Sequence, residues 1–177
     1  LNEAEPPPPD DVFSMELMAG WNLVSSPVAP NEFELETLFS HIADAILQLR
    51  DVDGNVYNPS ENTNDIGSWN YLNSYQAKLS AVANIEFTGL LMPQGTEYLL
   101  QEGWNWISYS RLDTLIPTQV FNQFSESVDF VVVDKHHKFH SHFGFNTLGM
   151  IYPGDGIRIY VAGEIGDGIP FVWEDVQ

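Results

Sequence analysis

The sequence lacks cysteine, and it has only 6 lysine and arginine residues against 25 acidic residues. The absence of cysteine excludes disulfide bonds, thiol catalysis and cysteine-ligated zinc. The formal net charge of −19 argues against nucleic acid as a partner and against an anionic membrane surface, because both need clustered cations. No apolar run approaches the roughly 18–20 residues of a membrane-spanning helix, so we expect no membrane insertion.

Signatures of catalysis are also missing, because the sequence has no nucleophile elbow, no His-Glu-x-x-His motif and no phosphate-binding loop. We therefore predict that the protein is not an enzyme. Its 177 residues, 44% of them hydrophobic and 13% aromatic, are enough for one medium domain or two small ones. Residues 1–12 place four prolines between acidic residues, and we expect them to form a solvated polyproline linker.

An internal repeat organises the rest of the chain. The tripeptide Gly-Trp-Asn occurs twice, 83 positions apart, and the apolar pattern that follows it is preserved. We place repeat one at residues 13–89 and repeat two at residues 90–177. The repeated residues are Gly20, Trp21 and Asn22 in the first copy, and Gly103, Trp104 and Asn105 in the second.

We expect the tripeptide to have a structural role. Glycine permits a strained backbone, tryptophan fills a large volume in a core, and asparagine closes a turn through bonds between its side chain and the main chain. We therefore expect two equivalent hydrophobic cores, each anchored by one tripeptide.

Period-two alternation bounded by turn residues predicts mostly β-strands. We expect Tyr75, Ala77 and Leu79 to share one strand face, and the same of Ile157, Ile159 and Val161. Each copy has one helical candidate, at residues 31–49, with the end of that range turning into a strand, and at residues 117–124. The predicted fold is mainly β, with one short helix per repeat and two pseudo-symmetric repeats in a sandwich or a barrel.

The segments from Gly20 to Ser25 and from Gly103 to Ser108 resemble the "GWNLIS" repeat of large secreted or surface-attached bacterial proteins. The turn and strand from Pro153 to Ile159 are similar to the closure of that repeat, whereas Ser74 to Ala77 in copy one lacks the glycine pair. The resemblance implies an extracellular, non-catalytic accessory module that acts as a spacer, in adhesion or in ligand presentation. It also implies flanking domains of the same polypeptide as partners, and it assigns no functional residues.

A carbohydrate-binding module is the first alternative, with a polysaccharide or another surface protein as the partner. Trp69 and Tyr71 alternate beside the amides of Asn70 and Asn73. Exposed rings stack on the apolar faces of sugars, and amides bond their hydroxyls, so these four residues are the candidate ligand site.

A metal-binding module is the second alternative. His136, His140 and His142 would share one face of a strand and could bind Zn²⁺, although Lys138 lies on the same face. We otherwise expect no cofactor. Residues 51–55 begin like a calcium loop but lack its later glycine and glutamate, and so predict a hairpin turn. Weak calcium binding elsewhere is a further alternative, at Asp65, Asp155 or Asp167.

Overall fold

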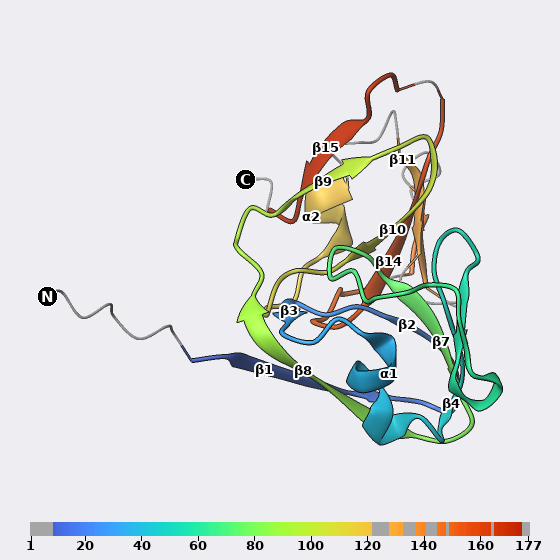
Figure 1. Ribbon diagram of the computed structural model, residues 1–177. Coiled ribbons are helices and arrows are strands. Elements are labelled where there is room, and N and C mark those ends of the chain that lie inside the picture. The colour runs from blue at the N-terminus through green and yellow to red at the C-terminus, as the bar shows by residue number, and fades with distance from the viewer. Residues whose placement is uncertain are drawn as a thin grey trace, which may run out of the picture.

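The computed structural model describes residues 9–121, 128–132, 137–140, 145–147, 149–163 and 165–174. The protein is mainly β, with 47% strand and 11% helix. Its strands form four antiparallel sheets (Figure 1), none of which closes into a barrel in the described part of the chain. Among the described residues no helix is both long enough and apolar enough to cross a membrane.

The N-terminal half, β1 to β8, contains two sheets and lies at the bottom of Figure 1. The smaller sheet consists of β1 (Asp11–Leu17), β8 (Ala83–Leu91) and β3 (Val28–Pro30), in that order. The larger sheet has the order β2 (Gly20–Val24), β7 (Tyr75–Leu79), β4 (Ile46–Arg50), β5 (Val56–Asn58) and β6 (Thr63–Asn64). The short helices of the N-terminal half are α1 (Leu35–Leu38), η1 (Ser40–Ile42) and η2 (Pro59–Glu61).

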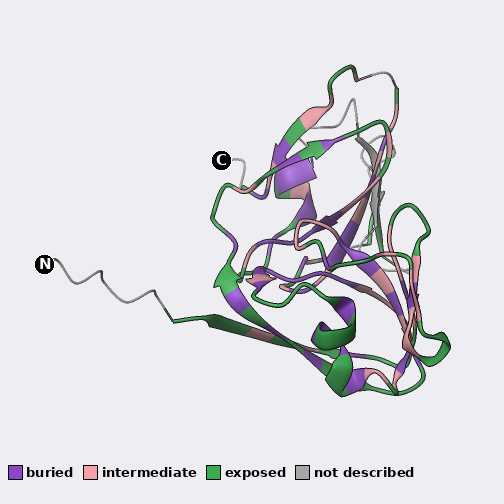
Figure 2. Cartoon of the chain, in the orientation of Figure 1, coloured by how far each residue is buried: buried purple, intermediate pink, exposed green. Residues whose placement is uncertain are grey.

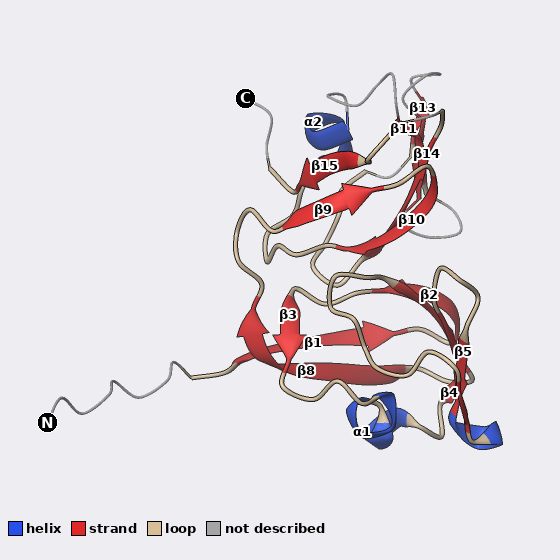
Figure 3. Cartoon of the chain, turned by 45° about the horizontal axis from the view of Figure 1, so that its top comes forward, coloured by secondary structure: helices blue, strands red, loops and turns tan. Residues whose placement is uncertain are grey.

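The C-terminal half, β9 to β15, also contains a smaller and a larger sheet. The smaller sheet pairs β9 (Glu97–Leu100) with β15 (Ile169–Val172). The larger sheet has the order β10 (Gly103–Ser108), β14 (Gly156–Val161), β11 (Val128–Val132), β12 (Lys138–His140) and β13 (Phe145–Asn146). The helix α2 (Pro117–Phe121) packs beside β15 (Figure 3).

Each half has its own hydrophobic core, formed by residues of both its sheets. In the N-terminal half, Phe87 of the smaller sheet joins Tyr75 of the larger one. In the C-terminal half, Phe171 of the smaller sheet and Ile159 of the larger sheet lie in the same core. The predicted strand faces of β7 and β14 are confirmed, because Tyr75, Ala77 and Leu79, and likewise Ile157, Ile159 and Val161, are buried. Figure 2 shows the buried positions alternating with exposed ones along the strands.

The helix predicted from residue 31 is wrong in its extent. Only Leu35–Leu38 is α-helical, a single 3-10 turn follows, and β4 begins at Ile46 as the sequence indicated. Glu34 occupies the N-cap position, and Asn31 lies outside the helix, where its side-chain amide donates to Asp10 at 2.8 Å. The apolar residues of this segment are nevertheless buried in the core, namely Leu35, Leu38, Phe39 and Ile42.

Two predicted boundaries do not coincide with the ends of strands. β1 begins at Asp11, inside the predicted linker 1–12, because Asp11 pairs with Gly89. β8 runs on to Leu91 and crosses the predicted boundary between residues 89 and 90. Strand pairing therefore extends the N-terminal half by about two residues at each end.

Short main-chain contacts join the two halves directly. The amide of Ser25 donates to the carbonyl of Gly154 at 2.9 Å, and the amide of Ser108 donates to the carbonyl of Leu72 at 3.0 Å. Gly156 lies at this junction, where an added Cβ would come within 2.8 Å of Leu23 Cγ. Only glycine permits so close an approach of β14 to β2.

Candidate functional site

The prediction that Trp69 presents an exposed ring is wrong. Its side chain is only 2% exposed and stacks on Tyr75 with the ring centroids 4.3 Å apart. Phe87 and Phe39 pack around it at 5.2 and 5.8 Å. Trp69 therefore fills the core of the N-terminal half, and a sugar cannot reach it.

The other members of the predicted sugar site are used mainly in packing and turns. Tyr71 is half-buried and contacts both hydrophobic cores. Asn70 accepts a bond from the amide of Leu72, and its own amide donates to the hydroxyl of Tyr75 at 2.8 Å. Asn73 forms an isolated antiparallel β-bridge with Ile107 of the other half. Tyr71 and Asn73 thus link the halves, Asn70 closes a local turn, and none of them forms a ring-lined surface with Trp69.

The histidine cluster falls largely outside the described residues, since His136 and His142 are not among them. His140 belongs to β12, where its Cα pairs with those of Phe130 and Phe145. Within the described ranges no group of three histidine, cysteine or acidic residues could hold a metal ion. Zinc at the histidine cluster stays a prediction, as does calcium at Asp65, Asp155 or Asp167.

The two Gly-Trp-Asn corners have the same local geometry, at the start of β2 and of β10. Gly20 has φ +93° and Gly103 has φ +88°, in the left-handed region that favours glycine. The Asn22 side chain accepts from the amide of Met18 at 2.9 Å and donates to its carbonyl at 2.8 Å. Asn105 makes the same two bonds to Gln101, at 2.8 and 2.7 Å. The expected roles of glycine and asparagine are confirmed.

The expected role of tryptophan at these corners is wrong. Trp21 is 39% exposed and Trp104 is 45% exposed, so neither fills a core. Both rings lie on the outer face of their sheet, because the inward phase of each strand is set by the buried Val24 and Ile107.

Cations lie over both of these exposed rings. Arg50 and Lys78 approach the Trp21 centroid at 5.7 and 5.6 Å. Arg158 lies 6.0 Å from the Trp104 centroid and 5.6 Å from that of Trp106. Three of the six cationic residues of this acidic chain thus take part in cation–π contacts on these two faces.

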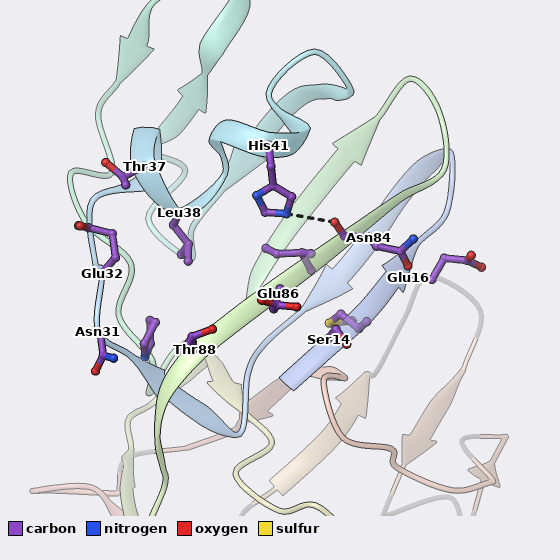
Figure 4. Close-up of a pocket in the computed structure, with 13 residues that line it drawn as sticks. Ser14, Glu16, Asn31, Glu32, Thr37, Leu38, His41, Asn84, Glu86 and Thr88 are labelled. Atoms are coloured by element: carbon purple, nitrogen blue, oxygen red, sulfur yellow. Dashed lines mark hydrogen bonds between the residues drawn. The ribbon is translucent and has the colours of Figure 1, made fainter. Parts of the chain in front are cut away.

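A groove with a volume of about 780 Å³ lies between the outer face of β8 and the α1–η1 segment (Figure 4). Its base is formed by the exposed positions of β1 and β8, and its wall by Asn31, Glu32, Thr37 and His41. His41 reaches down from η1, and its Nε2 lies 3.2 Å from the carbonyl oxygen of Asn84. Leu38 and Met15 add apolar surface.

The groove combines hydroxyl, amide and carboxylate groups, and among the residues that the structure describes no lysine or arginine lines it. Ser14 pairs with Glu86 across the two strands, and Glu16 pairs with Asn84. Such a surface can accept hydrogen bonds and bind cationic groups. Sequence reasoning missed this site, because no local signal placed η1 beside the outer face of β8.

A scan against protein-family models found no match, and searches of curated proteins and of solved structures found no match either. The resemblance to the GWNLIS repeat therefore stays a prediction from the sequence.

Proposed function

We propose that this chain is a non-catalytic accessory module of a larger secreted or surface protein of bacteria. In this proposal two copies of one ancestral unit form a single sandwich-like body, which spaces neighbouring domains of the same polypeptide and presents a binding surface.

The observation that carries this proposal is the reciprocal contact between the halves. The donors Ser25 and Ser108 are 83 positions apart, the offset of the two tripeptides, and their acceptors Leu72 and Gly154 are 82 apart. In a two-fold arrangement of identical units, each contact from the first unit to the second recurs from the second to the first. A duplicated unit accounts for this pattern, and the pattern supports the proposal in this way.

Buried polar groups at this junction support a single rigid body. The Ser25 hydroxyl donates to the carbonyl of Asp155 at 2.6 Å and accepts from the amide of Tyr109 at 3.1 Å. The Ser74 hydroxyl donates to the carbonyl of Ile157 at 3.2 Å. Separation of the halves would break these bonds and expose Tyr71, which packs against both cores. A spacer needs this coupling, because independent halves would bend about the junction.

Scanning calorimetry of the full chain tests the single body. We expect one unfolding transition whose calorimetric and van't Hoff enthalpies agree. Two resolved transitions, one for each core, would reject the spacer.

A second candidate function, polysaccharide binding, is favoured by the exposed rings of Trp21 and Trp104. Neighbouring side chains hold these rings in place: Tyr160 packs edge-on against Trp104 at 5.2 Å, in addition to the cations. A ring already held in place loses little freedom when a sugar stacks on it.

Affinity electrophoresis in neutral polysaccharides tests this second function. Trp104→Ala should abolish any retardation, whereas Leu99→Ala, an exposed apolar control in the same half, should keep it. Retardation of the Trp104 variant equal to that of the native chain would reject a role for this ring.

A further inference from the structure

The groove beside β8 carries a concentrated and unbalanced negative charge. Glu16 and Glu86 project from the same outer sheet face, and Glu32 stands on the opposite wall (Figure 4). Glu16 and Glu86 lie diagonally across adjacent strands, a spacing at which long side chains interact. The only ion pair within the described ranges, Arg111 with Asp113, involves neither of them. A cationic group entering the groove would relieve this repulsion.

The groove also exposes part of a sheet edge. On the side of β8 that faces β3, the Thr88 carbonyl accepts from the amide of Asn31 at 2.9 Å. On the same side, His41 contacts the Asn84 carbonyl. Main-chain groups of alternate residues point to the same edge of a strand, so the amide and carbonyl of Glu86 lie between these two contacts. No hydrogen bond from a described residue reaches them on this side.

These two features together fit a peptide better than a simple cation. One residue of an added antiparallel strand can satisfy both the amide and the carbonyl of a single residue such as Glu86. The side chain of that residue then lies on the outer face beside the carboxylate of Glu86. The side chains of its two neighbours point to the opposite face, where Met15 and Leu38 add apolar surface. Because Asn31 and His41 close the two ends, the main-chain contact is local and does not extend into a long strand.

We propose that this groove binds an extended, lysine- or arginine-rich segment of a partner protein. The segment makes main-chain hydrogen bonds to Glu86 and places its cationic side chains against Glu16, Glu86 and Glu32. The chain's net charge of −19 attracts such a segment over a distance and accelerates its encounter with the groove. This inference is independent of the duplication proposed above, and its failure would leave that proposal intact.

Fluorescence anisotropy with the full chain tests the inference, with a labelled short peptide that alternates threonine and lysine as the probe. Glu16→Gln/Glu86→Gln removes both carboxylates of the sheet face. Glu97→Gln/Glu102→Gln makes the same change in net charge at exposed positions of the other half, and is the matched control. Ser14→Lys is a second groove variant, which places a cation opposite Glu86 within the chain itself.

We expect saturable binding that weakens as salt is added. The groove double variant and Ser14→Lys should each weaken it about five- to tenfold, and the control double variant less than about twofold. Spermine, a cation without a peptide main chain, should displace the probe less well than unlabelled peptide of equal charge. Unchanged melting temperatures establish that the variants fold, and Ser14→Lys decides the matter if the double variant does not.

Three results would overturn the proposal. The first is an absence of binding to the native chain. The second is equal weakening by the groove and control variants, which means that net charge alone attracts the peptide. The third is displacement by spermine as effective as displacement by the peptide, which means that the Glu86 edge takes no part.

Discussion

Replacement of the corner asparagines tests whether the two tripeptides stabilise the fold equally. Asn22→Ala removes one bond accepted from Met18 and one donated to it, together with longer bonds to the carbonyls of Gly20 and Ala77 at 3.2 and 3.4 Å. The bonds to Met18 are exposed, so water replaces them and each contributes only about 0.5–1.5 kcal/mol. We therefore expect Asn22→Ala to lower the free energy of unfolding by about 2 kcal/mol.

Asn105→Ala should have the same effect, because its bonds to Gln101 have the same pattern and nearly the same lengths. Urea unfolding followed by tryptophan fluorescence measures both losses, and the melting temperature should fall by about 4–8 °C in each variant. The double variant should lose the sum of the two effects within about 0.5 kcal/mol.

Gln101→Ala is the control at the second corner, because it removes a side-chain amide and leaves the main-chain partner of Asn105 in place. It should change the free energy of unfolding by less than about 0.5 kcal/mol. A loss that small for either asparagine variant, or a difference of more than about 1 kcal/mol between them, would refute equivalent corners.

Three further predictions concern the junction, an ion pair and the histidines. Gly156→Ala places a Cβ against Leu23 and should lower the free energy of unfolding in urea by about 1–3 kcal/mol; an unchanged midpoint would contradict the tight junction. Hydrogen bonds from Arg111 lower the pKa of Asp113 below its ordinary 3.8. The unfolded chain therefore binds that proton at higher pH, so the stabilisation is complete above the ordinary pKa and is lost as pH falls through the lower folded one. Asp113→Asn should make the loss of stability in acid shallower, and an identical pH profile would contradict the pairing. Titration of the native chain with zinc should give a measurable heat of binding, and alanine substitution of His136, His140 and His142 should abolish that heat. The absence of heat from the native chain would reject the site.

The sequence predicts the strands and the glycine and asparagine positions well, because these depend on local rules. Alternation around Ala77 and Ile159 fixed which residues share a face, and each asparagine bonds a residue only four positions away. The side on which Trp21 and Trp104 lie was predicted wrongly, since alternation gives a period and not a direction. The phase of the apolar Val24, buried three positions after Trp21, is the signal that points the ring outward.

Long-range packing explains the other differences. Trp69 is buried because Phe39 and Phe87, from other parts of the chain, pack around it, and the residues next to it in the sequence do not indicate this. The groove likewise depends on His41 meeting Asn84, a contact between residues 43 positions apart. Such contacts follow from the fold and not from the local sequence.

Hydrogen exchange of the amides of Ser25 and Ser108 tests most directly whether two equivalent halves form one body. These amides donate the two reciprocal bonds between the halves. We predict that both exchange only through global unfolding, with the same free energy as core amides such as those of Ala77 and Ile159. Exchange of either serine amide through a low-energy opening, while both cores stay protected, would contradict the account.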